Sequence, residues 1–224
     1  MTRELVVAAY DKYLDWLDRL NPNIKETVYR KGNEPQERDA EIKLEPNKGR
    51  CVHTFFNHIY TNYDNLSDIT FFGQDWPFDH WEDIVEVINN ETEESRCQLK
   101  IGGYYGFHFN TITVPSPLGG MMWSLSPSTH HGEGNVLICN SNGFPQDSNP
   151  NINVDKYWSL FFKQVPPPAE YQFMPGGHFG LKREHAQLRS KEFYKKIVDF
   201  LLEDDVAPWI IERLECYIFN PKIK

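Results

Sequence analysis

The 224-residue sequence is poor in cysteine. It has only four cysteines, which lie far apart and form no Cys-x-x-Cys pair: Cys51, Cys97, Cys139 and Cys216. This spacing argues against a zinc site of the usual kind. It also argues against a disulfide framework and fits a reducing compartment, in which cysteines behave as small core residues.

Long apolar runs and an excess of positive charge are also missing. No run is long enough to span a membrane, and the amino terminus shows no signal-peptide core, so we expect a cytoplasmic protein without a transmembrane segment. The formal net charge is -9. A broad nucleic-acid surface needs a basic face, so we expect no nucleic acid polymer as a partner. A small nucleotide stays possible, because a phosphate site needs only a few cations and N–H donors.

Two common hydrolase signatures are absent. The sequence contains neither a Gly-x-Ser-x-Gly elbow nor a His-Glu-x-x-His pair. Serine hydrolase and zinc-protease functions therefore have no motif support. No internal repeat and no low-complexity linker divides the chain, so we expect one domain over residues 1–224.

Strand and helix patterns alternate along the first half of the chain. Residues 4–11 contain a continuous apolar run between Glu4 and Asp11, which is typical of a central strand buried on both faces. Residues 69–73 predict a second buried strand, and residues 50–63 and 190–202 predict amphipathic helices. This alternation favours an α/β fold with a mixed, mainly parallel central sheet flanked by helices. Residues 110–151 are irregular and rich in Gly, Pro, Ser and Asn, which is typical of a functional or mobile segment.

An acidic segment, Asp75-Trp76-Pro77-Phe78-Asp79-His80, follows the 69–73 strand. Ligands of open α/β sheets bind outside the carboxyl ends of the strands. Asp75 and Asp79 are therefore candidate ligands for a hard cation such as Mg²⁺ or Mn²⁺, and candidate general bases. The alternative is that the two carboxylates cap the following turn and helix. Both interpretations fit the sequence.

Three further positions are candidates, each with a structural alternative. Lys48 and Arg50 flank a glycine at a predicted helix start, where N–H groups attract phosphate; the alternative is a solvated helix start. His178 follows two glycines and is a candidate metal or phosphate ligand; the alternative is a buried histidine that donates to a carbonyl. Glu212 on the last predicted helix is a candidate general base; the alternative is a surface salt bridge with Arg213 or Lys195.

Several blocks of the sequence resemble GT-A glycosyltransferases. The blocks are Leu5–Asp11 with Trp16 and Leu17, Asn47–Arg50, His58–Leu66, Ile69–His80, Gly176–Glu184 and Glu212–Leu214. The chain is similar to the glycosyltransferase domain of large chlorella-virus enzymes and to a related glycosyltransferase-like family of fungi and bacteria. The resemblance spans nearly the whole chain.

The resemblance implies a metal-dependent glycosyltransferase with a GT-A-like single domain. Such an enzyme moves a hexose, or a deoxyhexose such as L-rhamnose, from a nucleotide donor, expected to be a UDP-sugar, to a glycan hydroxyl. The nucleotide-binding half would cover about residues 1–110, and the acceptor-side half about residues 111–224. The compartment would be the cytoplasm, or the host cytoplasm if the protein is viral.

The resemblance also implies functions for individual residues. The donor nucleotide would be bound by residues at three strand and helix ends: Ala8, Ala9, Tyr10, Lys48, Arg50, Gln74 and Asp75. A divalent Mn²⁺ or Mg²⁺ would be held by Asp79, Asp75 and His178, and catalysis would fall to Asp79, Asp75 and Glu212. The usual metal motif is Asp-x-Asp, whereas this sequence has Asp-x-x-x-Asp. The resemblance therefore does not divide the functions between Asp75 and Asp79.

Two other classes of function fit the same residues. A hydrolase of nucleotide sugars or other phosphate esters would use the same acidic segment. A non-catalytic carbohydrate- or nucleotide-binding module would use the abundant aromatic residues, 14% of the chain, as its binding platform.

Overall fold

The structure is a computed structural model that describes residues 1–32, 38, 40–79, 84–90, 122–124, 137–139, 152–169, 171–173 and 178–219. Its main feature is a six-stranded sheet with the strand order β3-β2-β1-β4-β8-β5. The strands are β1 (Arg3–Ala9), β2 (Ile24–Arg30), β3 (Ile42–Lys43), β4 (Ile69–Gln74), β5 (Met122–Ser124) and β8 (Phe179–Lys182). A separate pair is formed by β6 (Leu137–Cys139) and β7 (Tyr171–Phe173).

The sheet is mixed, as expected, but it is not mainly parallel. Strand β1 pairs parallel with β2 and with β4, and β2 pairs parallel with β3. Strand β8 pairs antiparallel with β4 on one side and with β5 on the other. The reason is that β8 begins at the sheet edge where β4 ends, so it must run back along β4. The expectation of a mainly parallel sheet is therefore wrong for this half of the sheet.

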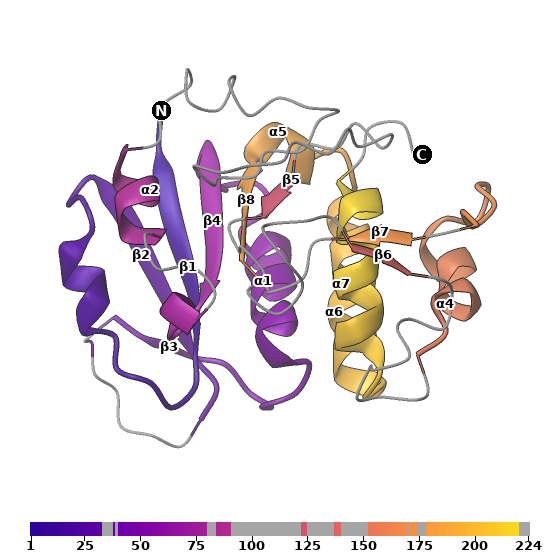
Figure 1. The fold of residues 1–224 in the computed structure, drawn as a ribbon, viewed down its shortest axis with the longest axis horizontal. Helices are drawn as coiled ribbons and strands as arrows, with labels where there is room; N and C mark the ends of the chain where they lie inside the picture. The colour runs from indigo at the N-terminus through magenta and orange to yellow at the C-terminus, as the bar shows by residue number, and fades with distance from the viewer. Residues whose placement is uncertain are drawn as a thin grey trace.

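Helices cover both faces of the sheet (Figure 1). On one face α1 (Arg50–Thr61) packs against β1 and β4, and α6 (Lys191–Glu203), α7 (Ala207–Ile218) and α4 (Val154–Phe161) extend the same larger apolar core beyond α1. The other face packs against the 3-10 helix η1 (Asp15–Arg19) and α2 (Ile84–Asn90) in a smaller core. Two short helical turns, η2 (Pro77–Asp79) and α5 (Arg183–Ala186), follow β4 and β8 respectively. The predicted α/β class with flanking helices is confirmed.

Strand β1 shows why its sequence is apolar without alternation. Val6 and Ala8 belong to the larger core, whereas Leu5, Val7 and Ala9 belong to the smaller one. Side chains of a strand alternate between the two faces of a sheet, so a strand covered on both faces must be apolar at every position. The prediction of a central strand in this segment is confirmed.

Two parts of the sheet differ from the sequence patterns. The sequence pattern over residues 171–181 predicts one strand interrupted at Pro175-Gly176-Gly177, but the two pieces, β7 and β8, belong to different sheets. Strand β3 lies in a polar segment that shows no strand pattern. The irregular segment 110–151 contains β5 and β6, and the rest of it lies outside the described residues.

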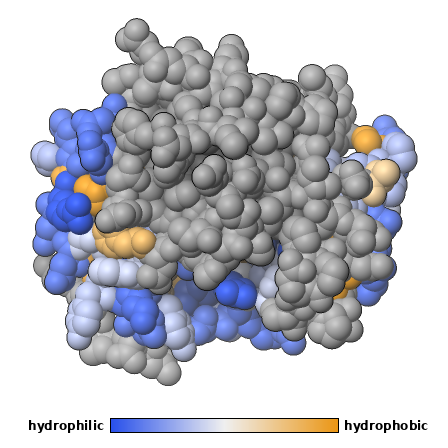
Figure 2. All heavy atoms as spheres, in the orientation of Figure 1, coloured by the Kyte–Doolittle hydropathy of each residue, from blue (hydrophilic) through white to orange (hydrophobic). Residues whose placement is uncertain are grey.

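None of the helices within the described residues is both long and apolar enough to cross a membrane. The described surface that faces the viewer in Figure 2 is mainly hydrophilic, with small apolar spots. The cytoplasmic location expected from the sequence stays a prediction.

Candidate functional site

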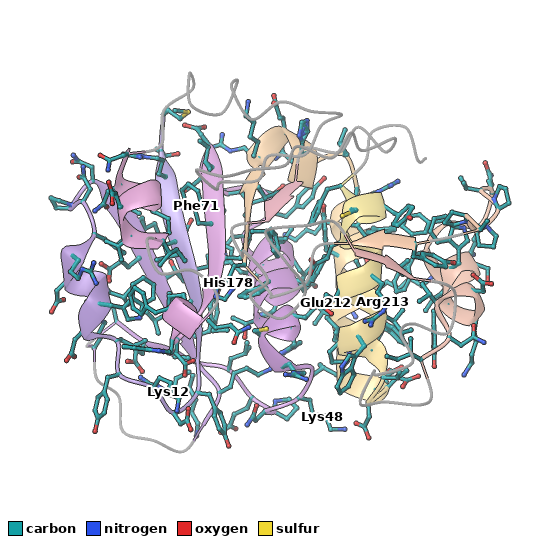
Figure 3. The ribbon with its side chains drawn as sticks, viewed as in Figure 1. Lys12, Lys48, Phe71, His178, Glu212 and Arg213 are labelled. Carbon is teal, nitrogen blue, oxygen red and sulfur yellow. The ribbon has the colours of Figure 1, made fainter. Side chains whose placement is uncertain are left out.

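The carboxyl ends of β1 and β4 lie side by side at the centre of the sheet. The two strands are parallel neighbours, and Ala8 of β1 is in register with Gln74 of β4. The chain leaves β1 towards β2 on one side and returns through α1 to β4 on the other side. This arrangement is a topological switch point, where open α/β sheets bind their ligands. Lys12 marks this edge of the sheet in Figure 3.

Asp75 joins the two strand ends. One oxygen of its carboxylate, Oδ2, accepts hydrogen bonds from the backbone N–H groups of Tyr10, Asp11 and Lys12, at 2.9, 3.1 and 3.1 Å. The other oxygen, Oδ1, accepts from the N–H of Trp76 at 3.0 Å. The loop after β1 is therefore fixed to the loop after β4 by a single carboxylate.

These contacts favour the capping interpretation of Asp75. Successive backbone N–H groups form a concavity that binds anions, and here Asp75 itself occupies it. A cation that took Asp75 as a ligand would compete with four N–H donors for the same two oxygens. The geometry thus assigns Asp75 to positioning the loop, while its predicted metal and catalytic functions stay predictions.

Replacing Asp75 with alanine should loosen this loop. A lost capping interaction costs about 0.5–2 kcal/mol, and Asp75 serves several N–H groups, so we expect the free energy of unfolding to fall by about 2 kcal/mol. Amide hydrogen exchange at Tyr10, Asp11 and Lys12 should accelerate at the same time. Asp11→Ala is the matched control, because the half-exposed Asp11 carboxylate lies in the same loop and makes a long ion pair with Lys12, at 3.9 Å. Equal exchange rates in the two variants would contradict the anchoring function.

The three predicted nucleotide-binding residues at the end of β1 differ in exposure. Ala8 and Ala9 are buried and point into opposite cores. The side chain of Tyr10 is 52% exposed, and its ring lies against Gly32, where an added Cβ would come within 3.4 Å of it. Of the three, only Tyr10 presents its side chain to a ligand, and the alanines can contribute only their main chain.

His178 lies beside the end of β4, immediately before β8. Its side chain is buried, and its Nε2 accepts a hydrogen bond from the backbone N–H of Gln74 at 3.3 Å. For Nε2 to accept, a neutral ring must carry its proton on Nδ1. The structure therefore brings two predicted site residues, His178 and Gln74, into contact. The contact orients the chain at the end of β4, and the predicted metal-binding function of His178 stays untested.

Lys48 and Arg50 lie at the start of α1, and a buried residue holds this start in place. Lys31 donates from Nζ to the main-chain oxygens of Lys48 and Arg50, the latter at 3.0 Å, and lies 3.2 Å from Nδ1 of His53. Burial lowers the pKa of Lys31 to about 8. Burial, helped by the Lys31 charge, lowers the pKa of His53 to about 4.

The two predicted phosphate contacts are themselves exposed. Lys48 donates from Nζ to the carbonyl of Leu202 at 3.3 Å, and the guanidinium of Arg50 lies over the ring of Trp209 at 5.3 Å. Both side chains are exposed and make single surface contacts, so they can change rotamer to bind a ligand. The cations at this helix start are compatible with a phosphate group nearby.

Asp79 ends η2, and its side chain lies outside the described residues, as does His80. Within the part of the chain that the structure describes, no three His, Cys, Asp or Glu side chains gather to hold a metal ion. Asp75 and His178 each use their candidate ligand atoms in hydrogen bonds to the main chain. The ligand set expected from the sequence includes Asp79, whose side chain is not described, so this metal site stays a prediction.

Glu212 lies on α7 and is partly exposed, with its Oε2 at 3.6 Å from an Arg213 nitrogen. In Figure 3 it lies well away from Lys12, with α1 between them in the view. One turn further along, Glu215 is buried, and burial together with the Glu212 charge raises its pKa well above the usual range. The Glu212 charge also acts on the thiol of Cys51, in the first turn of α1, and the predicted catalytic function of Glu212 stays a prediction.

A buried ion pair at the end of β2 escaped the sequence analysis. Arg30 donates from Nε and Nη2 to the two carboxylate oxygens of Glu41, at 2.8 and 2.9 Å, and both side chains are almost wholly buried. Arg30 also donates to the carbonyl of Tyr10 at 3.4 Å. A charged residue that ends a buried strand was the only available signal, since Glu41 lies in a segment that looks solvated.

Comparison with known proteins gives one match. The model of the family described as "Protein of unknown function (DUF3431)" matches residues 5–223. The chain belongs to this family. The match begins within β1 and ends beyond α7, so it covers both strand ends of the candidate site. The curated proteins and the solved structures offer no match to the chain.

Proposed function

We propose that the protein is a GT-A-like glycosyltransferase that binds a nucleotide sugar, expected to be a UDP-sugar, at the carboxyl edge of β1 and β4. The observation that carries the proposal is the switch point itself, where two parallel strand ends meet beside the start of a helix. Nucleotides bind at such points in open α/β sheets. The choice of a sugar nucleotide and of a glycan acceptor comes from the sequence resemblance.

The residues around the strand ends support a nucleotide ligand. The exposed ring of Tyr10 offers a face for a base, and bases stack on aromatic rings. Lys48 and Arg50, at the start of α1, offer positive charge for a diphosphate. The fixed loop after β1 keeps Tyr10 in place, so little ordering is needed on binding.

In this proposal Asp79 is the first candidate ligand of the divalent cation. Asp75 accepts hydrogen bonds from backbone N–H groups and His178 accepts one from Gln74, so the proposal places Asp79 first among the metal ligands and keeps the other two as further candidates. When bound, Mn²⁺ or Mg²⁺ would neutralise the leaving diphosphate. In an inverting transfer, a carboxylate would take the proton of the acceptor hydroxyl as its oxygen attacks the anomeric carbon and the bond to the diphosphate breaks.

Asp79→Ala should abolish metal-dependent UDP binding and leave folding cooperative. We expect UDP with Mn²⁺ to raise the melting temperature of the wild-type protein and to leave that of the variant unchanged, because only a bound ligand stabilises the folded state. Asp15→Ala is a suitable control, since Asp15 is an exposed carboxylate on η1. An equal shift in wild type and Asp79→Ala would make Asp79 a structural residue.

Turnover separates the proposed function from its alternatives. The protein is incubated with UDP-glucose or UDP-L-rhamnose and Mn²⁺, with and without neutral oligosaccharides, and released UDP is measured. A transferase releases UDP faster with an acceptor. Release that never depends on an acceptor would indicate a hydrolase, and sugar binding that ignores both metal and UDP would indicate a binding module.

A further inference from the structure

An exposed tryptophan lies next to the Asp75 anchor. The side chain of Trp76 is 41% exposed, although the ring is large and apolar. Its backbone N–H donates to the Asp75 carboxylate, which also holds the loop that carries Tyr10. Single exposed apolar residues are common on protein surfaces. Exposure alone therefore does not indicate a binding site, and the contacts that hold the Trp76 ring must be considered.

Trp76 is supported by a cluster of aromatic rings in edge-to-face contact. It meets Phe78 edge to face, with 4.9 Å between ring centroids and an angle of 70°. Phe78 in turn meets Trp16 edge to face at 5.7 Å, and the guanidinium of Arg19 lies over the Phe78 ring at 5.7 Å. Phe78 is half-buried against the smaller core, and Trp16 is buried within it. Each such contact adds about 0.5–1.5 kcal/mol beyond burial of area.

A hydrogen bond fixes one of these rings, Trp16, to the main chain next to Trp76. The indole N–H of Trp16 donates to the carbonyl of Asp75 at 2.7 Å, directly before Trp76. Trp76 is thus held in two ways: its backbone N–H is bonded to Asp75, and its ring packs against Phe78. A rigid aromatic side chain loses little conformational entropy when a ligand covers it.

The surroundings of Trp76 suit a neutral, polar ligand better than a polyanion or an apolar partner. The side chains near Trp76 carry charges of both signs, with exposed Asp11 and Lys12 on the neighbouring loop and Arg19 over the Phe78 ring. A pyranose ring has a face of C–H groups that can lie on the negative face of an aromatic ring. Its hydroxyls can reach the polar groups of the adjacent loop, and ligand sites commonly combine aromatic walls with a few polar groups.

We infer that Trp76, supported by Phe78, forms a stacking subsite for a pyranose unit of a neutral glycan. The inference rests on the proposed function, because it places the acceptor glycan beside the nucleotide sugar. Tyr10 then serves the donor and Trp76 serves the acceptor, on the two loops that Asp75 joins. In this arrangement the Asp75 carboxylate holds the two aromatic residues in position relative to each other.

The test measures oligosaccharide and UDP binding separately on the full chain. The probes are cellotetraose, chitotetraose, laminaritetraose and maltotetraose, detected by saturation-transfer NMR and titrated by calorimetry, and UDP with Mn²⁺. We expect Trp76→Ala and Trp76→Leu to weaken the best oligosaccharide about tenfold, because loss of a stacking contact of this size corresponds to about one factor of ten. Trp76→Tyr keeps a ring and should stay within about threefold, and UDP affinity should not change.

Leu188→Ala is the matched control, since Leu188 is also 41% exposed but follows α5, at the opposite edge of the sheet. The subsite is overturned if none of the four oligosaccharides binds the wild-type chain, or if Trp76→Leu binds them as the wild type does. Oligosaccharide binding that depends on Trp76 without any UDP binding would reject the proposed transferase and keep the subsite. If Trp76→Ala does not fold, the comparison of the leucine and tyrosine variants decides.

Discussion

Arg30→Met is expected to lower the free energy of unfolding by about 3–5 kcal/mol, the cost of leaving one partner of a buried ion pair alone. The guanidinium and the Glu41 carboxylate are 3% and 0% exposed, and they are joined by two parallel hydrogen bonds. Without Arg30, the Glu41 carboxylate would be buried without its counter-charge. Chemical denaturation followed by circular dichroism measures the change.

Two further variants make this result interpretable. The double variant Arg30→Met/Glu41→Leu should recover most of the lost stability, because well-packed apolar residues often replace a buried ion pair at little cost. Lys43→Met tests an exposed pair, since the side chains of Lys43 and Glu45 are 65% and 66% exposed, and it should cost less than about 1 kcal/mol. If Arg30→Met lowers the free energy of unfolding no more than Lys43→Met does, the buried pair does not organise the end of β2.

Gly49→Ala is expected to cost about 3 kcal/mol or more in stability. Gly49 has a φ of 69°, a left-handed conformation that costs an L-residue about 1–2 kcal/mol. In addition, an alanine Cβ would lie 2.6 Å from the Cβ of His53 and 3.0 Å from the carbonyl oxygen of Leu201. Neither atom is the end of a flexible side chain, so α1 or α6 must shift.

A second substitution at the same position separates strain from contact. Asparagine tolerates the left-handed conformation but carries the same Cβ. Gly49→Asn should therefore be nearly as destabilising as Gly49→Ala if the close contacts dominate, and clearly milder if the backbone conformation dominates. Thermal unfolding of both variants beside Asn47→Ala, an exposed position in the same loop, gives the comparison. Melting temperatures equal to that of the wild type would show that the start of α1 can relax.

The sequence was sufficient to predict which segments meet at the candidate site. The apolar runs before Tyr10 and Gln74 predict buried strands, and the rule that ligands bind at strand ends predicts that their termini form one edge. The hydrogen bonds from Tyr10 to Asp75 and from Gln74 to His178 confirm that these segments come together. This inference works because the pattern of apolar residues indicates which segments are buried. Buried strands lie at the centre of a sheet, so their ends lie next to each other.

The functions of individual polar side chains could not be predicted in the same way. An aspartate after a strand can cap a loop or bind a metal, and the N–H groups that Asp75 caps become visible only in the structure. Likewise, the partner of Arg30 lies in a polar segment, where nothing in the sequence marks Glu41 as buried. Pairings of this kind depend on tertiary structure, which the local pattern does not encode.

The antiparallel placement of β8 has a consequence for synthesis of the chain. Ile69–Phe72 of β4 pair with β8, yet 104 positions separate Gln74 from His178. At about 5–20 residues per second, a ribosome needs roughly 5–20 seconds to make that stretch. During this interval the outer edge of β4 has no native partner, and an unpaired strand edge is a template for association with other chains. The nascent protein should therefore depend most on chaperones after β4 has emerged and before β8 closes the sheet.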